Sequence, residues 1–311
     1  MSTLICGSIA FDSIMVFNGR FKDHILPDQV HVLNVSFLVP ELRREFGGCA
    51  GNIAYNLKLL GGTPLPMATV GDDAQPYLER LDRLGIDRRY VRGIAGAMTA
   101  HGHVVTDMDD NQIWAFHPGA MSFSHTSEVP RDAGVRLGIV APDGRDGMLS
   151  HAQQFAQAGI PFIFDPGQGL PMFSAQELDT FISQTQYLAV NDYEARLMQD
   201  KLGVPMHDVA RRVKALIVTR GGEGSEIHVD GRLIRIPVAR AHKTTDPTGC
   251  GDAYRAGLLF GIEHAMDWDT AGRLAAVMGA LKIETSGGQN HQTDRDRIAD
   301  RFHESFGYRP W

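Results

Sequence analysis

The sequence predicts an α/β fold with a doubly wound, mostly parallel sheet flanked by helices and a small β lid. Three observations favour this fold. Strand-like and helix-like segments alternate from residue 134 onward, which is typical of βαβ units. A short apolar run at residues 4–10 is followed closely by a polar residue, Asp12, as expected for a buried strand of a parallel sheet. Shorter alternating pieces interrupt the first half of the chain and predict the lid.

The body of the fold is predicted from hydrophobic patterning. We expect residues 4–10 to form the first strand, with Asp12 at its carboxyl end facing a ligand crevice. Asp230 and Gly231 predict a hairpin turn with a return strand at 234–238. The remaining pattern predicts strands at residues 137–141, 161–165, 187–191 and 215–219, and helices at residues 147–158, 175–184, 192–201, 251–264 and 268–285.

The lid is predicted from two excursions outside the main sheet. Residues 13–46 contain short alternating pieces, of which residues 30–39 are the clearest. Residues 109–111 (Asp-Asp-Asn) predict a turn between strand-like residues 103–106 and 112–116. We expect both excursions to pair in one lid, inserted at about 13–46 and 97–120. Because the sequence shows no internal repeat, low-complexity tract or Pro/Ser linker, residues 1–311 are expected to form a single α/β domain.

Composition and charge exclude several classes of partner. The 311 residues include 30 Lys and Arg against 37 Asp and Glu, so the formal charge of -7 provides no global basic field for nucleic acid or an anionic membrane. The amino terminus lacks a positively charged leader, and no apolar run reaches the about 18 residues of a membrane helix, so we expect a cytoplasmic protein. Its 3 cysteines have neither a disulfide framework nor metal-ligand spacing.

The stretch at residues 246–257 (DPTGCGDAYRAG) carries the strongest chemical signal. It joins a strand to a helix, so the amides of Gly249, Cys250 and Gly251 can point into one concavity and bind an anion at the helix amino terminus. Asp252 beside such an anion suggests a general base. An ordinary helix start with an acidic first turn is the alternative interpretation. The chain contains no Gly-Lys pair and does not complete GxGxxG here, which excludes a P-loop and disfavours a dinucleotide fold.

A second glycine-rich stretch occupies residues 46–57 (FGGCAGNIAYNL). Its glycines, Gly48 among them, permit close approach of the backbone to a ligand at a helix start. Asn52 can both donate and accept the hydrogen bonds that sugar hydroxyls require. A tight turn packed under the helix is the alternative interpretation.

Together the two stretches resemble the paired signatures of the PfkB or ribokinase family of carbohydrate kinases, in the same order and about 200 residues apart. The resemblance covers nearly the whole chain. Residues 7–12, 45–54 and 116–121 are similar to adenosine-kinase-like bacterial nucleoside kinases, including those of broad base specificity. The resemblance implies a ribokinase-like fold, the cofactors ATP and Mg²⁺, and transfer of the ATP γ-phosphate to the ribose 5′-hydroxyl. The expected substrates are purine nucleosides (adenosine, inosine, guanosine) and, with broad specificity, pyrimidine nucleosides such as cytidine.

The resemblance also implies roles for individual residues. Asp12 would bind the ribose 2′ and 3′ hydroxyls, with Gly48 and Asn52 completing the sugar site, and Asp252 would be the catalytic base beside the anion hole of Gly249, Cys250 and Gly251. Phe116 and Gln168 are the expected walls of the base site, and Phe37 is a further lid candidate. The expected ATP and metal residues are Asn191, Thr219, Gly221 and Gly224 for ATP, Glu194 for Mg²⁺ through water, and Asp246 and Thr248 for a monovalent cation, K⁺.

Two other functions remain open from the sequence. A sugar kinase would act on free ribose or on fructose 6-phosphate, although no cationic clamp for an existing phosphate is visible. A catalytically silent nucleoside-binding protein is the second alternative. The expected partners are small molecules only, with neither nucleic acid nor membrane among them. Exposed lid strands fit either a monomer or a homodimer that pairs through its lid.

Overall fold

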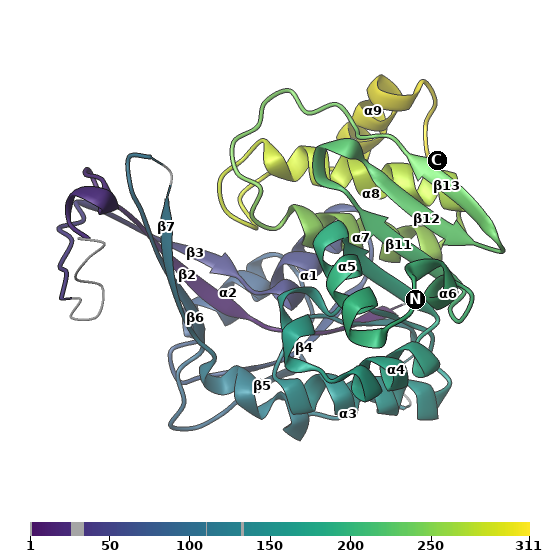
Figure 1. Cartoon of the computed structure of the whole chain (residues 1–311), viewed down its shortest axis with the longest axis horizontal. Coiled ribbons are helices and arrows are strands. Elements are labelled where there is room, and N and C mark those ends of the chain that lie inside the picture. Colours follow the sequence, from purple (N-terminus) through teal and green to yellow (C-terminus); the bar gives the residue numbers. More distant parts are fainter. Residues whose placement is uncertain (1, 26–33, 110, 132–133) are drawn as a thin grey trace.

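The structure is a computed structural model that describes residues 2–25, 34–109, 111–131 and 134–311. It shows a body in which helices cover both faces of a sheet, and a lid that projects from one side of the body (Figure 1). Among the described residues, no helix is long and apolar enough to cross a membrane.

The main sheet confirms the predicted doubly wound, mostly parallel architecture. In the described residues the sheet has nine strands, in the spatial order β13 (Arg232–Ile236), β12 (Ser225–Val229), β11 (Ala215–Thr219), β10 (Tyr187–Asn191), β9 (Phe162–Phe164), β8 (Val135–Val140), β1 (Ser2–Cys6), β4 (Pro64–Val70) and β5 (Tyr90–Gly93). In this order, all neighbouring strands between β11 and β5 are parallel, whereas β12 is antiparallel to both β11 and β13 at one edge.

The return strand of the predicted hairpin begins earlier than residue 234. Asp230 and Gly231 both have positive φ, +50° and +70°, so they complete a two-residue turn and pairing resumes directly with Arg232 opposite Val229. Because the turn is tight, β13 begins at Arg232, two residues before the start that hydrophobicity indicated.

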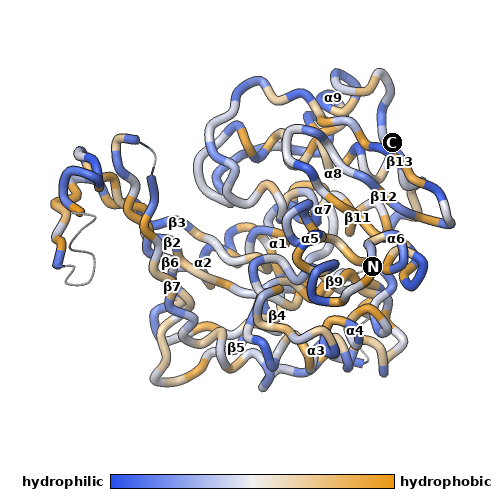
Figure 2. The backbone as a smooth tube through the Cα atoms, in the orientation of Figure 1, coloured by the Kyte–Doolittle hydropathy of each residue, from blue (hydrophilic) through white to orange (hydrophobic). Residues whose placement is uncertain are grey.

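Helices cover the two faces of the sheet. Strand side chains alternate between faces, so Leu4 and Cys6 belong to one buried cluster and Ile5 to the other. Figure 2 shows hydrophobic residues concentrated along the central strands of the body. One face packs against α3 (Arg145–Ala158), α4 (Ala175–Gln184), α5 (Asp192–Leu202) and α6 (Met206–Ala210), and the other against α1 (Cys49–Leu59), α2 (Gln75–Arg83), α7 (Cys250–Glu263), α8 (Trp268–Ile283) and α9 (Arg295–Phe306).

The lid is a separate sheet, and its strands confirm the predicted small β lid. In the described residues it has four strands in the order β3 (Glu41–Gly47), β2 (Ala10–Val16), β6 (Ala100–Thr106) and β7 (Gln112–His117). The predicted hairpin around residue 109 is the β6–β7 pair. Strand β7 is one edge strand of the lid sheet, and all of its residues are exposed.

The single strand predicted at residues 4–10 is wrong. Strand β1 ends at Cys6, and the chain then leaves the main sheet: the Gly7 amide donates to the Met67 carbonyl oxygen and the Ser8 amide to that of Pro142. The chain re-enters pairing at Ala10 as strand β2 of the lid. Asp12 therefore lies within a lid strand and not at the carboxyl end of a core strand. Ile9, which lies between the two strands, is buried in the body core. The hydrophobic pattern at residues 4–10 therefore does not show where the chain passes from one sheet to the other.

The strand expected at residues 30–39 is also misplaced. Residues 30–33 lie outside the described residues, and residues 34–39 form no strand. The lid strand lies instead at Glu41–Gly47, where most side chains are exposed. A strand with two exposed faces has no apolar alternation to mark it, which explains why β3 was missed.

Candidate active site

The residues predicted to form an anion hole lie at the amino terminus of α7. Gly249 has φ +79°, a left-handed conformation that glycine adopts without strain, and a Cβ there would come within 3.1 Å of the Gly288 Cα. Amides of a first helical turn have no partner inside the helix, and the helix dipole favours negative charge at this end. The start of α7 can therefore hold a phosphate group.

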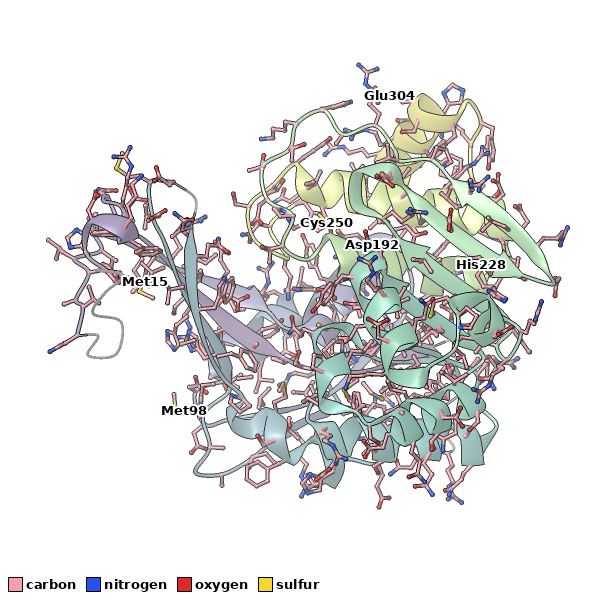
Figure 3. The ribbon with its side chains drawn as sticks, viewed as in Figure 1. Met15, Met98, Asp192, His228, Cys250 and Glu304 are labelled. Atoms are coloured by element: carbon pink, nitrogen blue, oxygen red, sulfur yellow. The ribbon has the colours of Figure 1, made fainter. Side chains whose placement is uncertain are left out.

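One of the three predicted anion-hole amides is already engaged. The Cys250 amide donates to the Pro247 carbonyl oxygen at 3.1 Å, because the loop turns tightly before the helix. The predicted amide contribution of Cys250 is corrected accordingly, and the amides of Gly249 and Gly251 remain for an anion. Figure 3 shows Cys250 on the body and Met15 in the projecting lid.

A cavity of about 580 Å³ lies on the lid side of this helix start. Side chains from the lid, α1, α7 and the segment after β9 converge on it, which brings together residues far apart in the sequence. Phe37 does not line this cavity and packs against Phe17 and Phe21, with ring centroids 4.8 and 5.0 Å apart. The predicted residues in its lining are Asp12, Gly48, Asn52, Phe116, Gln168, Thr248, Gly249 and Asp252.

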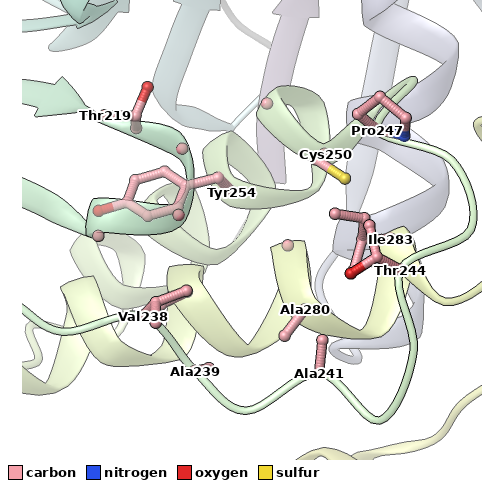
Figure 4. A pocket seen from close by; sticks show the side chains of 16 residues that line it. Thr219, Val238, Ala239, Ala241, Thr244, Pro247, Cys250, Tyr254, Ala280 and Ile283 are labelled. Atoms are coloured by element: carbon pink, nitrogen blue, oxygen red, sulfur yellow. The ribbon is translucent and has the colours of Figure 1, made fainter.

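A second cavity, of about 480 Å³, lies on the other side of the helix start. Figure 4 shows its walls: Val238 and Ala241 on the loop that precedes α7, Ala280 and Ile283 on α8, and Tyr254 on α7. The predicted residues in its lining are Thr219, Gly221, Gly224, Cys250 and Gly251. Among the described residues, Asn191, Glu194 and Asp246 line neither of these two cavities.

Asp252 is held by a hydrogen-bonded chain that the sequence did not reveal. The Asn52 side chain donates to Asp252 Oδ2 at 2.8 Å. Gln289 Nε2 lies 3.1 Å from Asn52 Oδ1 and 2.6 Å from the Tyr77 hydroxyl oxygen, and that hydroxyl donates to the Gly47 carbonyl oxygen at 2.7 Å. Gln289 and Tyr77 carry no motif, so only their position in space assigns them this orienting role.

The environment of Asp252 suits a proton acceptor. Burial and, to a lesser extent, the nearby Asp165 carboxylate raise the pKa of Asp252 to about 7, although Asn52 and Arg255 act in the opposite direction. A carboxyl group with a pKa near neutrality can accept a proton in one step and release it in the next.

The pH profile tests this environment. Since the carboxylate is the proton-accepting form, we expect kcat/KM to rise with pH through a midpoint of about 7. Asn52→Ala removes a donor that stabilises the carboxylate, so its midpoint should move upward. Gln154→Ala on α3, which loses an amide contact to Ser150, should keep the wild-type midpoint. A profile that stays flat across this range in the wild-type enzyme would contradict the assignment.

Asp12 reaches the lid-side cavity from strand β2. Its neighbours across the lid sheet are Glu45 on β3 and Gly102 on β6. Burial and, secondarily, the Glu45 carboxylate raise the pKa of Asp12 to about 6. Gly48, with φ +84°, lies against the chain just before β2, where a Cβ would come within 2.5 Å of the Ser8 carbonyl oxygen. This contact keeps the lid strand close to the start of α1.

Glu194 belongs to the same buried charge cluster as Asp252, because both carboxyl groups lie near Asp165 and Arg255. Glu194 accepts from the Asn191 amide at 2.8 Å and from its side chain at 2.9 Å, and Asn191 Oδ1 in turn accepts from the Glu194 amide at 2.7 Å. The predicted NxxE element therefore forms a capping box at the start of α5. Burial and Asp165 raise the pKa of Glu194, while Arg255 lowers it.

Arg255 and Asp165 form the ion pair at the centre of that cluster. The guanidinium donates to both carboxylate oxygens at 3.0 and 3.1 Å, and each side chain is 6% exposed. No sequence pattern indicated this pair, because its members lie 90 residues apart.

Removing Arg255 should destabilise the fold. Arg255→Met leaves the Asp165 carboxylate buried without its partner, and we expect a loss of about 3–5 kcal/mol in the free energy of unfolding. Denaturant titration measures this loss. The control Arg211→Ala breaks an exposed pair with Asp208 and should leave stability close to wild type. Equal stabilities of the two variants would contradict the importance of the buried pair.

Asp143 is another carboxyl group in the lid-side cavity that sequence reasoning missed. It is 3% exposed, its Oδ1 accepts from the Gly144 amide at 2.8 Å, and its Oδ2 has no hydrogen-bond partner among the described residues. Burial raises the pKa of Asp143 to about 8. It faces the cavity together with Gln168, so it adds a polar group to the expected base wall.

Comparison with known proteins identifies the family. Residues 10–295 match the pfkB family carbohydrate kinase. The chain belongs to the pfkB family of carbohydrate kinases. It is therefore a phosphotransferase with an alcohol group as acceptor, as the sequence predicted.

Several relatives of this pfkB kinase have been named or solved. It is 32% identical over 274 residues to a nucleoside kinase of Methanocaldococcus jannaschii, covering 86% of this chain and 89% of that protein. It is 32% identical over 304 residues to a nucleoside kinase of Methanothermobacter thermautotrophicus, covering 96% and 98%. The structure of Burkholderia thailandensis nucleoside kinase in complex with inosine has a TM-score of 0.90 and 54% identity, and covers 99% of both chains. Its complex with ADP-inosine has a TM-score of 0.88 and 57% identity, and covers 99% of this chain and 97% of that chain.

Proposed function

We propose that this pfkB kinase transfers the γ-phosphate of ATP to the ribose 5′-hydroxyl of purine nucleosides and, with broad base specificity, of pyrimidine nucleosides. The observation that carries the proposal is the position of Asp252 and the Gly249 and Gly251 amides between two cavities. The lid-side cavity contains the Asp12 carboxylate, which suits a diol, and the polar side chains of Gln168 and Asp143. The second cavity has mainly apolar walls, which suit an adenine ring. The Burkholderia thailandensis relative solved with inosine and with ADP-inosine supports this assignment.

The nucleoside would occupy the lid-side cavity. Asp12 accepts hydrogen bonds from the 2′ and 3′ hydroxyls, and Asn52 and the backbone at Gly48 complete the sugar contacts. Phe116 on β7 provides an aromatic face for the base, and the Gln168 amide meets its polar edge. Free ribose would leave this outer part of the cavity unfilled, which favours a nucleoside over the sugar alone.

ATP would occupy the second cavity with its phosphates at the start of α7. Thr219, Gly221 and Gly224 line the side nearest to β11, and Asn191 ends the adjacent strand β10. Among the described residues, no group of three or more His, Cys, Asp or Glu is arranged to hold a metal ion. Mg²⁺ would therefore enter with the ATP phosphates, and the buried Glu194 carboxylate fits the predicted role of orienting water around it.

Asp252 then accepts the proton of the 5′-hydroxyl as its oxygen attacks the γ-phosphorus in line. The Gly249 and Gly251 amides stabilise the charge that spreads over the phosphoryl oxygens, and bound Mg²⁺ supplies further charge neutralisation. The lid is part of the single domain and is inserted at about 13–46 and 97–120. Its movement would exclude water that could otherwise accept the phosphoryl group.

The test is ATP-dependent ADP release in the presence of Mg²⁺ against adenosine, inosine, guanosine, cytidine, ribose and fructose 6-phosphate, with Asp252→Asn as the blank. We expect turnover with nucleosides. Turnover with free sugars alone would overturn the proposal in favour of a sugar kinase. Binding of nucleosides by calorimetry without any turnover would instead indicate a silent nucleoside-binding protein.

A further inference from the structure

A lysine is buried directly behind the anion-hole loop. Lys282, near the carboxyl end of α8, is 0% exposed. Its Nζ donates to the main-chain oxygen of Asp246 at 2.7 Å and to that of Thr285 at 3.0 Å. One acceptor lies on the loop that leads into α7, and the other lies just after α8. A fully buried lysine is rare, because an ammonium group must find acceptors to replace its water.

The two acceptors are held in place by a second set of hydrogen bonds. The amides of Thr245 and Asp246 both donate to the Ile283 carbonyl oxygen, at 2.8 and 3.1 Å. The carboxylate of Asp246 accepts from the amides of Thr248 and Gly287, at 2.8 Å each. The anion-hole loop is therefore tied to the end of α8, and the carbonyl oxygens of Asp246 and Thr285 converge on one point.

These contacts do not fit the monovalent cation that the resemblance implied at Asp246 and Thr248. Converging backbone carbonyl oxygens are the ligands that replace the hydration shell of K⁺. Here the Asp246 carbonyl oxygen already accepts from an ammonium group, and both of its carboxylate oxygens accept from backbone amides. A cation at this point would meet the fixed positive charge of Lys282 at close range.

We propose that the Lys282 ammonium replaces a monovalent cation in this kinase, so that its phosphotransfer requires no K⁺. The tethered charge stabilises the carbonyl oxygens at the end of α8, where the helix dipole favours a positive group. It also holds the loop of Gly249 and Gly251 in the geometry that receives the transferring phosphoryl group. Lys282 is a positioning residue, since it touches the loop and not the substrate, and the inference rests on the kinase activity proposed above.

A purely structural lysine makes a different prediction. Lys201 on α5 also donates to two carbonyl oxygens, those of Pro171 at 3.2 Å and Phe173 at 2.8 Å, but its loop does not lead into the anion hole. If Lys282 only stabilised the fold in the same way, its removal would lower stability without creating a dependence on cations. Lys201→Ala is therefore the matched control.

The experiment measures kcat as a function of KCl, with choline chloride holding the ionic strength constant. The wild-type enzyme should be equally active with and without K⁺. Lys282→Ala loses the charge and opens space, so its kcat in choline should fall by about 10- to 10²-fold and should be restored by K⁺ or ethylammonium. Lys282→Met loses the charge but fills the space, so neither cation should restore it. Lys201→Ala should acquire no cation dependence.

A second readout is independent of turnover. Crystals equilibrated with thallium acetate, in which Tl⁺ substitutes for K⁺, should show no anomalous peak between Asp246 and Thr285 in the wild-type enzyme and a peak in Lys282→Ala. The inference is overturned by K⁺ activation of the wild-type enzyme, by a Tl⁺ peak beside Lys282, by full activity of Lys282→Ala in choline, or by an impaired Lys282→Ala that no cation restores. Absence of turnover with every substrate would count against the proposed function, while the Tl⁺ result would still decide this inference.

Discussion

Asp252→Asn is expected to lower kcat by on the order of 10²- to 10⁴-fold while nucleoside binding stays nearly intact. The amide keeps the size of the side chain and can still meet Asn52, which contacts Asp252 Oδ2 at 2.8 Å. It cannot accept the 5′-hydroxyl proton. Steady-state ADP release gives kcat, and calorimetric titration with the nucleoside gives Kd.

A matched control separates this effect from the loss of an acidic helix start. Asp296 lies in the first turn of α9, is exposed and lines neither cavity, so Asp296→Asn should retain wild-type kcat. An unchanged kcat in Asp252→Asn would remove Asp252 as the base. The anion hole would then have to account for the rate by itself.

Asp12→Ala should lower kcat/KM for ribonucleosides by about 10²- to 10⁴-fold, because two hydrogen bonds to a charged acceptor are lost. The same variant should treat 2′-deoxynucleosides and ribonucleosides alike, since the group that distinguishes them is gone. The measurement is kcat/KM for inosine and for 2′-deoxyinosine in both enzymes. The ratio of the two values is less sensitive to partial unfolding than either value alone.

Glu41→Ala provides the control for the lid. Glu41 lies at the exposed far end of β3, opposite Val16, in the same small sheet as Asp12. Its removal should leave the preference for ribose unchanged. A ribose preference retained by Asp12→Ala would overturn the assignment of Asp12 to the diol.

Local patterns predicted many elements of the body because these are buried in a regular way, whereas strands β4 and β5 and helices α2, α6 and α9 were not predicted. Residues 175–184, 187–191 and 215–219 have the same bounds in the structure as in the prediction. Strand β2 was misplaced because the buried residue before it, Ile9, continues the apolar run of β1 into the lid. Strand β3 was misplaced because it is exposed on both faces. Hydrophobic periodicity reports burial, so it is silent where a strand is not buried on one side.

The α/β fold could be predicted from the amino-acid sequence because its strand-like and helix-like segments alternate, and the pfkB family from the resemblance of its two glycine-rich motifs to the family signatures. The side chains that surround these motifs come together only in the folded protein. Gln289 orients Asn52, Arg255 neutralises Asp165 and Lys282 holds the Asp246 carbonyl oxygen, and each contact joins residues far apart in the sequence. Contacts of this kind depend on how helices and strands pack, and a single sequence contains no periodic or local signal for them.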